Sequence, residues 1–280
     1  LIEAIRQGVA PENVFGLDTD ENAVLIAKQR IKDEFDYETE NVKVGDFLHE
    51  AIQLSSEKHS FDLIFTNPPW GKKIEKSAKE RYSILYGCGN SLDTTSLFIG
   101  ASFSILKQNG LLGFLMQEAF FNITTFEDIR RKVSSKRIIR FADYDKAFKG
   151  LVTKAQAIVI ENTFANSLDI IECSSGENVF YRTLASFTEN PKSIFNFWTN
   201  ETEAKVIDHL YALPHKTLKN KATWALGIVT GNNDRFCMNE PKQGYIPVYK
   251  GSDITKNGLK EPSTFILNDF SNFQQVAPLE

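Results

Sequence analysis

The 280-residue sequence is poor in the residues that build metal centres and disulfide frameworks. Its three cysteines, Cys88, Cys173 and Cys237, lie far apart, so their spacing indicates neither a zinc site nor a set of disulfides and is typical of a reducing cytoplasm. The four histidines are equally scattered. No apolar run is long enough to span a membrane, and no secretory signal is visible. The sequence therefore favours a cytoplasmic protein without a metal site.

A strong positive charge is also missing, because the formal net charge is −4. A protein that coats nucleic acid through bulk charge would be basic, whereas an enzyme with only local positive charge fits this value. Two clusters of Lys and Arg occur, in residues 72–81 and 130–140. Such runs usually form a solvated face, although the first cluster is also placed to contact DNA phosphates.

An apolar fraction of 42% permits a substantial core, and the length allows one large or two modest domains. Within it, a short apolar run at residues 63–65 predicts a buried strand that stops at Asn67-Pro68-Pro69-Trp70. Two prolines cannot donate to a sheet ladder, and they restrict their own backbone and that of Asn67. In open α/β sheets, ligands bind beyond the carboxyl ends of strands. We therefore expect a rigid polar group beside an aromatic ring at such an edge.

This arrangement suits a flat substrate such as a nucleobase. The side-chain carbonyl of Asn67 and the backbone carbonyl of Pro68 could accept hydrogen bonds from an exocyclic amine and make it more nucleophilic in the transition state. Trp70 could stack on the base, which must first leave the double helix. The alternative is a Pro-Pro turn with an aromatic residue packed beneath it.

Two acidic residues follow other expected strands, at residues 14–17 and 42–44. Asp18, in the segment Asp18-Thr19-Asp20, is placed to accept hydrogen bonds from ribose hydroxyls, and its alternative role is to cap the helix expected over 21–33. Asp20 is the better candidate for that cap. Asp46 could accept from an adenine amino group while Phe47 covers the ring, or the pair could form an ordinary turn.

These motifs together resemble the adenine-specific DNA methyltransferases of bacterial restriction-modification systems. Asn67-Pro68-Pro69-Trp70 resembles their motif IV, and the segments at Asp18 and Asp46 resemble motifs II and III. The resemblance implies that Asp18, Thr19, Asp46, Phe47 and Asn67 bind S-adenosylmethionine. It also implies that Phe148, in a segment like motif VIII, packs on the flipped adenine opposite Trp70. The alternative for Phe148 is a core position between strands.

The rest of the chain fits the gamma class of this family. We expect a long polar segment over 71–90, a helix that Asp93 caps and that runs to about residue 106, and a strand over 111–116. Further helices are expected over 126–133 and 201–213, and further strands over 137–141 and 157–160. Residues 224–236 predict a strand, a tight turn and a strand, and together with 246–254 they resemble the start of the target recognition domain in TaqI-like and Type IIG enzymes.

The resemblance implies a doubly wound, Rossmann-like α/β catalytic domain at 1–165, a connecting segment at 166–195 and the start of a mixed α+β recognition domain at 196–280. The family's glycine-rich motif I would lie just before Leu1. We therefore expect a fragment that binds S-adenosylmethionine poorly by itself and has double-stranded DNA as its partner. A fused endonuclease in the full-length protein is left open. The alternatives are a glutamine or ribosomal-RNA amino-methyltransferase and a non-catalytic DNA-binding component of phage defence.

Overall fold

The computed structural model describes residues 1–70, 74–147, 153–218, 220–223 and 227–276. Contacts within the chain divide it into two compact units, Leu1–Leu213 and Pro214–Glu280. In the described ranges, no helix combines the length and the apolar character that crossing a membrane requires.

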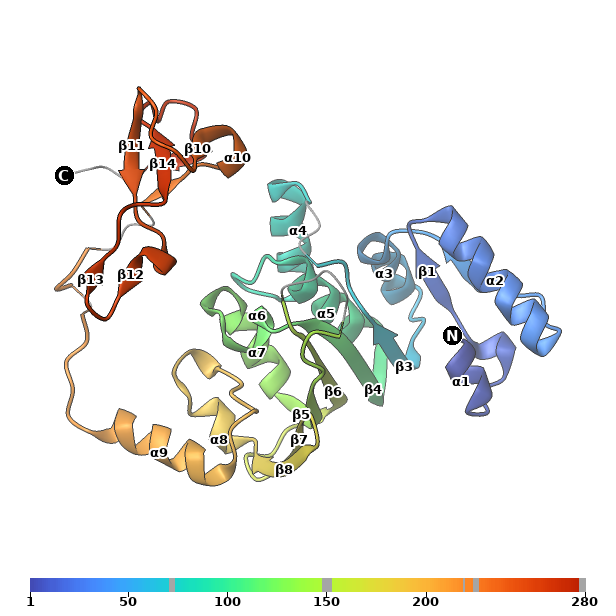
Figure 1. Ribbon diagram of the computed structural model, residues 1–280. Helices are drawn as coiled ribbons and strands as arrows, with labels where there is room; N and C mark the ends of the chain where they lie inside the picture. The colour runs from blue at the N-terminus through green and yellow to red at the C-terminus, as the bar shows by residue number, and fades with distance from the viewer. Residues whose placement is uncertain (71–73, 148–152, 219, 224–226, 277–280) are drawn as a thin grey trace. The chain divides into compact units, whose positions relative to one another are not determined.

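The larger unit contains a six-stranded mixed sheet in the order β3-β4-β6-β5-β7-β8 (Figure 1). β3 is parallel to β4 and β5 is parallel to β7, whereas β6 runs antiparallel to both of its neighbours. This mixed α/β architecture confirms the fold class expected from the sequence. The strands of the sheet are β3 (Phe61–Thr66), β4 (Leu106–Gln117), β5 (Lys136–Asp143), β6 (Ala155–Phe164), β7 (Ile170–Ser175) and β8 (Asn178–Thr183).

Two further strands form a separate small sheet near the N-terminus. β1 (Gly16–Asp18) is parallel to β2 (Val42–Val44), and α2 (Glu21–Phe35) connects them. A short helix, α1 (Ile2–Arg6), precedes β1. These elements share their own apolar core, which is separate from the core of the large sheet and consists of Ile5, Val14, Val24, Ile31 and Val42.

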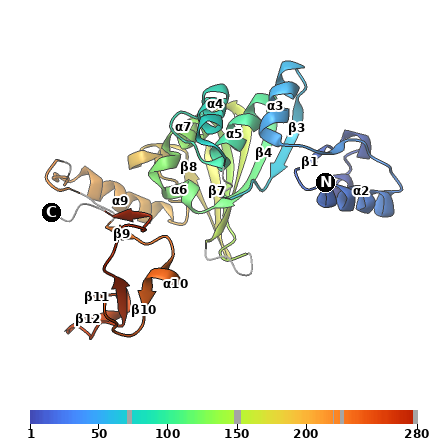
Figure 2. The same ribbon diagram turned by 90° about the horizontal axis from the view of Figure 1, so that it is seen from above.

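Helices cover one face of the large sheet (Figure 2). Leu112, Phe114 and Met116 of β4 point into a core that is shared with α3, α5 and α7. Because successive side chains of a strand point to opposite faces, these three alternate residues all lie on the face of β4 that packs against the helices. The helices between β2 and β5 are α3 (Phe47–Ser56), α4 (Lys76–Tyr86), α5 (Thr94–Ile105), α6 (Ala119–Asn122) and α7 (Glu127–Ser134).

The strand expected at residues 63–65 exists, but the prediction that it is buried is wrong. Leu63 is 44% exposed and Phe65 is 66% exposed. The reason is that β3 lies at the edge of the large sheet, where its second edge pairs with no described strand. The ring of Phe65 lies over Gly113 of β4, and a Cβ added to Gly113 would be 2.2 Å from its Cδ1.

Two other local expectations need correction: the structure of the polar segment after Trp70 and the start of the strand expected over 111–116. The polar segment contains a helix, α4, whose Ser83 and Tyr86 are buried. Asp93 caps α5 as predicted, because its side chain accepts a hydrogen bond from the Thr95 backbone N–H at 2.8 Å. The strand that follows begins at residue 106, earlier than expected, because α5 passes directly into β4 at that position.

The last part of the larger unit consists of α8 (Ala185–Thr188) and α9 (Glu201–Ala212). A capping box at Asn200 and Glu203 begins α9. The helical spacing of Ala204, Leu210 and Tyr211 predicts that all three face inward. Ala204 is buried, but Leu210 and Tyr211 are 59% and 54% exposed, so the prediction is wrong for these two. Leu210 and Tyr211 lie in the last turns of α9. Ala204 is the one buried residue of this helix, so the rest of its expected apolar face is exposed to solvent.

The smaller unit consists of short elements. β11 pairs with β14, which also pairs with β10, and Ile266 and Phe236 are its buried apolar residues. Residues 233–236 form a helical turn where a strand was expected, because the Asn232 side chain caps it through the Arg235 N–H. The elements are β9 (Ile228–Val229), α10 (Asn233–Phe236), β10 (Cys237–Met238), β11 (Tyr245–Val248), β12 (Ile254–Thr255), β13 (Gly258–Leu259), β14 (Thr264–Leu267) and β15 (Gln275–Val276).

Candidate functional site

The candidate site begins where β3 ends. Strand pairing stops at Thr66, and Asn67, Pro68 and Pro69 continue without regular structure. Pro68 is buried and anchors this segment, whereas Asn67 is exposed at the carboxyl end of the strand. Trp70 is half-buried, with its indole nitrogen inside. The Pro-Pro pair thus presents the Asn67 amide on a restricted backbone, as the sequence indicates.

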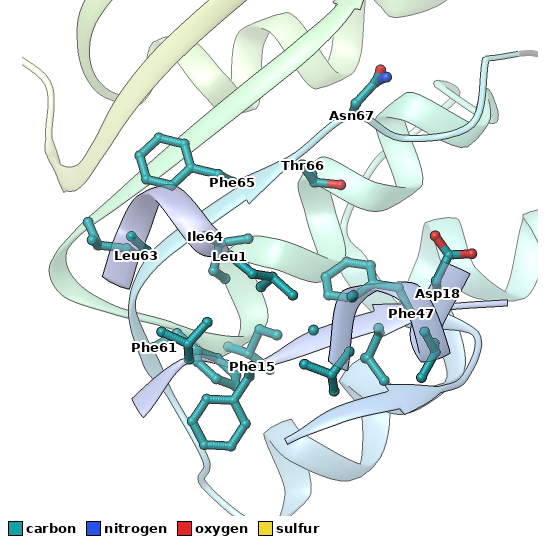
Figure 3. Close-up of a pocket in the computed structure, with 18 of the residues that line it drawn as sticks. Leu1, Phe15, Asp18, Phe47, Phe61, Leu63, Ile64, Phe65, Thr66 and Asn67 are labelled. Atoms are coloured by element: carbon teal, nitrogen blue, oxygen red, sulfur yellow. The ribbon is translucent and has the colours of Figure 1, made fainter. Parts of the chain in front are cut away.

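A pocket of about 550 Å³ lies between β1 and β3. Asn67 lines it together with Asp18, from the end of β1, and Phe47, from the first turn of α3 (Figure 3). Three of the residues named from the sequence therefore meet in one cavity, although they come from three segments of the chain. Because Asp18 and Asn67 are both exposed, their polar groups are accessible to a ligand.

Asp18 and Asp20 have different structural roles. Asp20 caps α2 by accepting a hydrogen bond from the Asn22 N–H at 2.9 Å, which confirms the prediction that it is the better cap. Asp18 accepts from the Asp20 N–H through Oδ1, also at 2.9 Å. That bond fixes the carboxylate at the pocket, and Oδ2 remains as an acceptor. Thr19 is exposed and is not among the residues that line the pocket.

Asp46 and Phe47 also divide their roles. Asp46 caps α3 through the Leu48 N–H at 3.0 Å and does not line the pocket, whereas Phe47 does. The ring of Phe47 lies 5.1 Å from that of Phe98, at an interplanar angle of 36°. Phe98, on α5, also lines the pocket. The sequence analysis missed Phe98 because it stands within an apolar helical run that indicates only core packing.

Phe148 lies outside the described residues. The described residues on either side of its segment form a narrow neck, in which the Tyr144 N–H donates to the Ala155 carbonyl at 2.9 Å. Lys154 pairs with Asp145 at 3.0 Å, and this ion pair raises the pKa of the lysine and lowers that of the aspartate. The neck holds both ends of the segment where β5 ends and β6 begins. This is the end of the sheet at which β3 ends and Asn67 follows.

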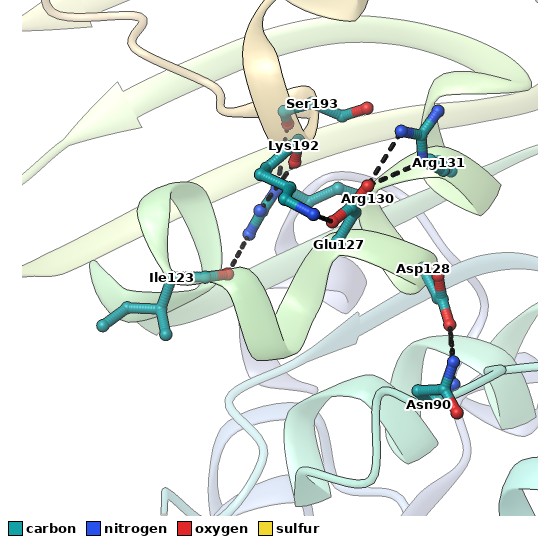
Figure 4. A network of polar contacts seen from close by, with 8 residues as sticks. All are labelled: Asn90, Ile123, Glu127, Asp128, Arg130, Arg131, Lys192 and Ser193. Atoms are coloured by element: carbon teal, nitrogen blue, oxygen red, sulfur yellow. Dashed lines mark hydrogen bonds and ion pairs between the residues drawn. The ribbon is translucent and has the colours of Figure 1, made fainter. Parts of the chain in front are cut away.

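The two basic clusters differ in burial. Arg130, in the second cluster, is fully buried and donates to the backbone carbonyls of Ile123, Lys192 and Ser193 (Figure 4). It also donates to the backbone carbonyl of Phe120. Burial lowers its pKa to about 10, so it stays charged at neutral pH. Arg130 therefore holds three segments together and is not available for DNA. In the first cluster, the side chains of Lys76 and Arg81 are exposed.

Known proteins resemble this chain in sequence. The Type II methyltransferase M.VspI of Vibrio sp. (strain 343) is 44% identical over 258 residues, which are 92% of this chain and 62% of M.VspI. The Type II methyltransferase M.BsuBI of Bacillus subtilis is 28% identical over 106 residues, which are 36% of this chain and 21% of M.BsuBI. The chain thus spans less than two thirds of the length of these relatives.

Solved structures share the fold at low sequence identity. The Type IIG restriction endonuclease BpuSI matches with a TM-score of 0.55 and 11% identity, over 95% of this chain and 38% of that enzyme. A nuclease-deletion mutant of the Type ISP restriction-modification enzyme LlaGI, in complex with a DNA substrate mimic, matches with a TM-score of 0.56 and 12% identity, over 84% of this chain and 29% of its own. Residues 12–149, which include most of the pocket-lining residues and the Asn67 segment, match the Eco57I restriction-modification methylase family.

Proposed function

We propose that this chain is the catalytic part of a DNA methyltransferase of a restriction-modification system. It would transfer a methyl group from S-adenosylmethionine to the N6 amino group of a flipped adenine. The observation that carries this proposal is the position of Asn67, which ends β3 at a pocket that also contains Asp18, Phe47 and Phe98. DNA as the substrate would place the enzyme in the cytoplasm.

The side chains at the pocket fit the nucleoside part of the cofactor. A carboxylate that is already oriented by one backbone N–H can accept from the ribose hydroxyls, which is the role proposed for Asp18. The rings of Phe47 and Phe98 can contact the adenine of the cofactor, since aromatic faces bind nucleobases by stacking. The bound cofactor supplies an electrophilic methyl group.

Asn67 and Pro68 would act on the target amine. Each offers a carbonyl oxygen that can accept from one N–H of the amino group, and this favours the tetrahedral geometry in which the nitrogen lone pair attacks. The rigid Pro68-Pro69 backbone keeps these acceptors in place, so the contribution to rate comes from positioning and electrostatics. No covalent enzyme intermediate is required.

Trp70 and Phe148 would hold the flipped base between two aromatic rings, each stack contributing roughly 1–3 kcal/mol. Trp70 is suited to this because its ring is only half-buried. Phe148 is proposed from its position in the sequence beside the neck at Tyr144 and Ala155. The smaller unit, 214–280, would contribute to recognition of the DNA sequence.

The decisive test uses the full-length parent protein with tritiated S-adenosylmethionine and genomic DNA. We expect label in N6-methyladenine, and a loss of at least 100-fold in kcat for Asn67→Ala, because a group that stabilises the transition state electrostatically contributes about that much. Asn178→Ala, at the exposed first residue of β8, is the matched control and should keep full activity.

Other outcomes would replace the proposal. Label on protein or ribosomal RNA would favour the amino-methyltransferases that act on those substrates. DNA binding without transfer to any acceptor would favour a non-catalytic component of phage defence. An Asn67→Ala variant with unchanged kcat would show that this segment is not the catalytic one.

A further inference from the structure

Two aromatic rings of the pocket belong to two different helices. Phe47, the first residue of α3, lines the pocket (Figure 3). Phe98 lies on α5, and the centroids of the two rings are 5.1 Å apart. Because each ring moves with its own helix, their separation depends on how α3 and α5 are held together. A ligand base that contacts both rings binds more tightly if this separation is fixed in advance.

Tyr86, at the end of α4, contacts both helices with the two ends of one side chain. Its hydroxyl donates a hydrogen bond to the Leu48 carbonyl of α3, with 2.6 Å between the two oxygens. Its Cβ lies against Gly100 of α5, where an added Cβ would be 2.8 Å away from it. Leu48 directly follows Phe47 in the sequence, and Gly100 lies in the same helical turn as Phe98. Tyr86 therefore joins the two helices at the turns that carry the rings.

The backbone at Tyr86 is itself held in place. Lys132 of α7 donates to the Tyr86 carbonyl, and also to the Gly87 carbonyl at 3.4 Å. Gly87 ends α4 in the left-handed conformation, at a φ of 62°, which glycine adopts without steric cost. The Cys88 thiol then donates to the Ser96 carbonyl of α5 at 3.4 Å. These contacts fix the position from which the Tyr86 side chain extends to α3.

The Tyr86 side chain is remote from a ligand in the pocket. It is 4% exposed and is not among the residues that line the pocket. Burial raises the pKa of its phenol, so the hydroxyl stays protonated and continues to donate to Leu48 at neutral and mildly basic pH. Any effect of this hydroxyl on ligand binding must therefore pass through α3 and α5.

We propose that Tyr86 is a positioning residue for the adenine ring of S-adenosylmethionine. By spanning α3 and α5, it sets the spacing at which the rings of Phe47 and Phe98 contact that adenine. The inference rests on the proposed function, because it takes the pocket as the cofactor site, and it assigns a role to a residue that does not line this pocket. The hydroxyl carries the role, since it makes the contact with α3.

The test measures binding of S-adenosylhomocysteine, the demethylated form of the cofactor, to the full-length parent protein by calorimetry. Tyr86→Phe removes only the hydroxyl and keeps the ring in the core. We expect its Kd to rise about 3- to 10-fold, which corresponds to the loss of one neutral hydrogen bond. The KM for S-adenosylmethionine should rise by the same factor with kcat unchanged, because contacts with the adenine are the same in the ground and transition states.

Tyr82→Phe is the matched control. Tyr82 is also on α4, and its ring stacks on that of Tyr86 with centroids 6.1 Å apart, but its hydroxyl is not the one that reaches Leu48. Its Kd should equal that of the unmodified protein. Thermal unfolding of each variant, followed by circular dichroism, checks that it folds. If Tyr86→Phe does not fold, Gly100→Ala is the second variant, because its methyl group displaces α5 from Tyr86 and should also raise Kd.

Double substitutions test whether the effect passes through the rings. In a Phe98→Leu background, Tyr86→Phe should change Kd much less, because one of the two rings is gone. In an Asp18→Ala background its effect should be undiminished, since Asp18 is on β1.

A Tyr86→Phe variant with a lower Tm but an unchanged Kd would overturn the proposal and show a purely structural role. Equal effects of Tyr86→Phe in the two backgrounds would also overturn it. Failure of the unmodified protein to bind S-adenosylhomocysteine would instead overturn the proposed function, and this inference with it.

Discussion

Asp18 has one oxygen occupied by a backbone N–H and one that remains available at the pocket. We predict that Asp18→Ala in the full-length protein raises KM for S-adenosylmethionine by about 10- to 100-fold with a much smaller change in kcat. The reason is that a hydrogen bond to a charged group contributes about 1.5–3 kcal/mol and that ribose contacts are the same in the ground and transition states. Steady-state kinetics measures both constants.

Asp33→Ala provides a comparison for this change. Asp33 is an exposed carboxylate on α2 that accepts from Gln29 and does not line the pocket. The KM of the Asp33→Ala variant for S-adenosylmethionine should equal that of the unmodified enzyme. If both variants raise KM equally, the effect belongs to net charge and the ribose role of Asp18 is wrong.

The three cysteines should differ in reactivity. Burial raises the pKa of Cys88 to about 11 and that of Cys173 to about 12, whereas Cys237 is partly exposed. Only the thiolate reacts with alkylating agents, so the two buried thiols stay protonated and inert until pH approaches these values. At pH 8 we predict that iodoacetamide labels Cys237 first, as peptide mass spectrometry would show. Rapid labelling of Cys88 in the folded chain would contradict this burial.

Among the elements, α5 links the pocket to the core of the large sheet. Its cap, Asp93, satisfies the Thr95 N–H, and most of the helix is buried. We predict that Asp93→Ala lowers the free energy of unfolding by about 1 kcal/mol, the usual effect of losing a cap. Asp93→Ser retains a capping oxygen and should lose much less. Urea denaturation of the three proteins decides this, and equal losses for Ala and Ser would show that capping is not the cause.

How far the elements follow from sequence depends on where their contacts lie. The caps at Asp20 and Asp93 and the end of β3 at Asn67 are local, because they depend on neighbouring residues, and they were predictable. The exposure of Phe65 was not, because it depends on which strand lies at a sheet edge.

The candidate site shows the same limit. The sequence identifies Asp18, Phe47 and Asn67, which the structure brings to one pocket. The helix α4 was missed because its polar residues have no strong helical period, and its burial of Tyr86 depends on a hydrogen bond to the distant Leu48 carbonyl at 2.6 Å. Phe98 was missed because pairing with Phe47 is a tertiary contact.

At the scale of the whole chain, both apolar cores lie within the larger unit. We therefore predict that a protein truncated after Leu213 keeps cooperative thermal unfolding, followed by circular dichroism, and loses sequence-specific binding to DNA. Non-specific binding measured on an unrelated duplex serves as the reference. A truncated protein that does not unfold cooperatively would show that the smaller unit is required for the fold of the larger one.

The contact between Phe65 and Gly113 makes two positions that are 48 residues apart in sequence depend on each other. Gly113→Ala alone brings a methyl group against the ring, and Phe65→Ala alone leaves the neighbouring backbone uncovered. The double substitution restores the fit, so the sum of the two single losses in stability should exceed the loss in the double variant. In evolutionary terms this pair is epistatic. A lineage that acquires a side chain at position 113 is expected to change position 65 as well, and the order of the two changes would be constrained.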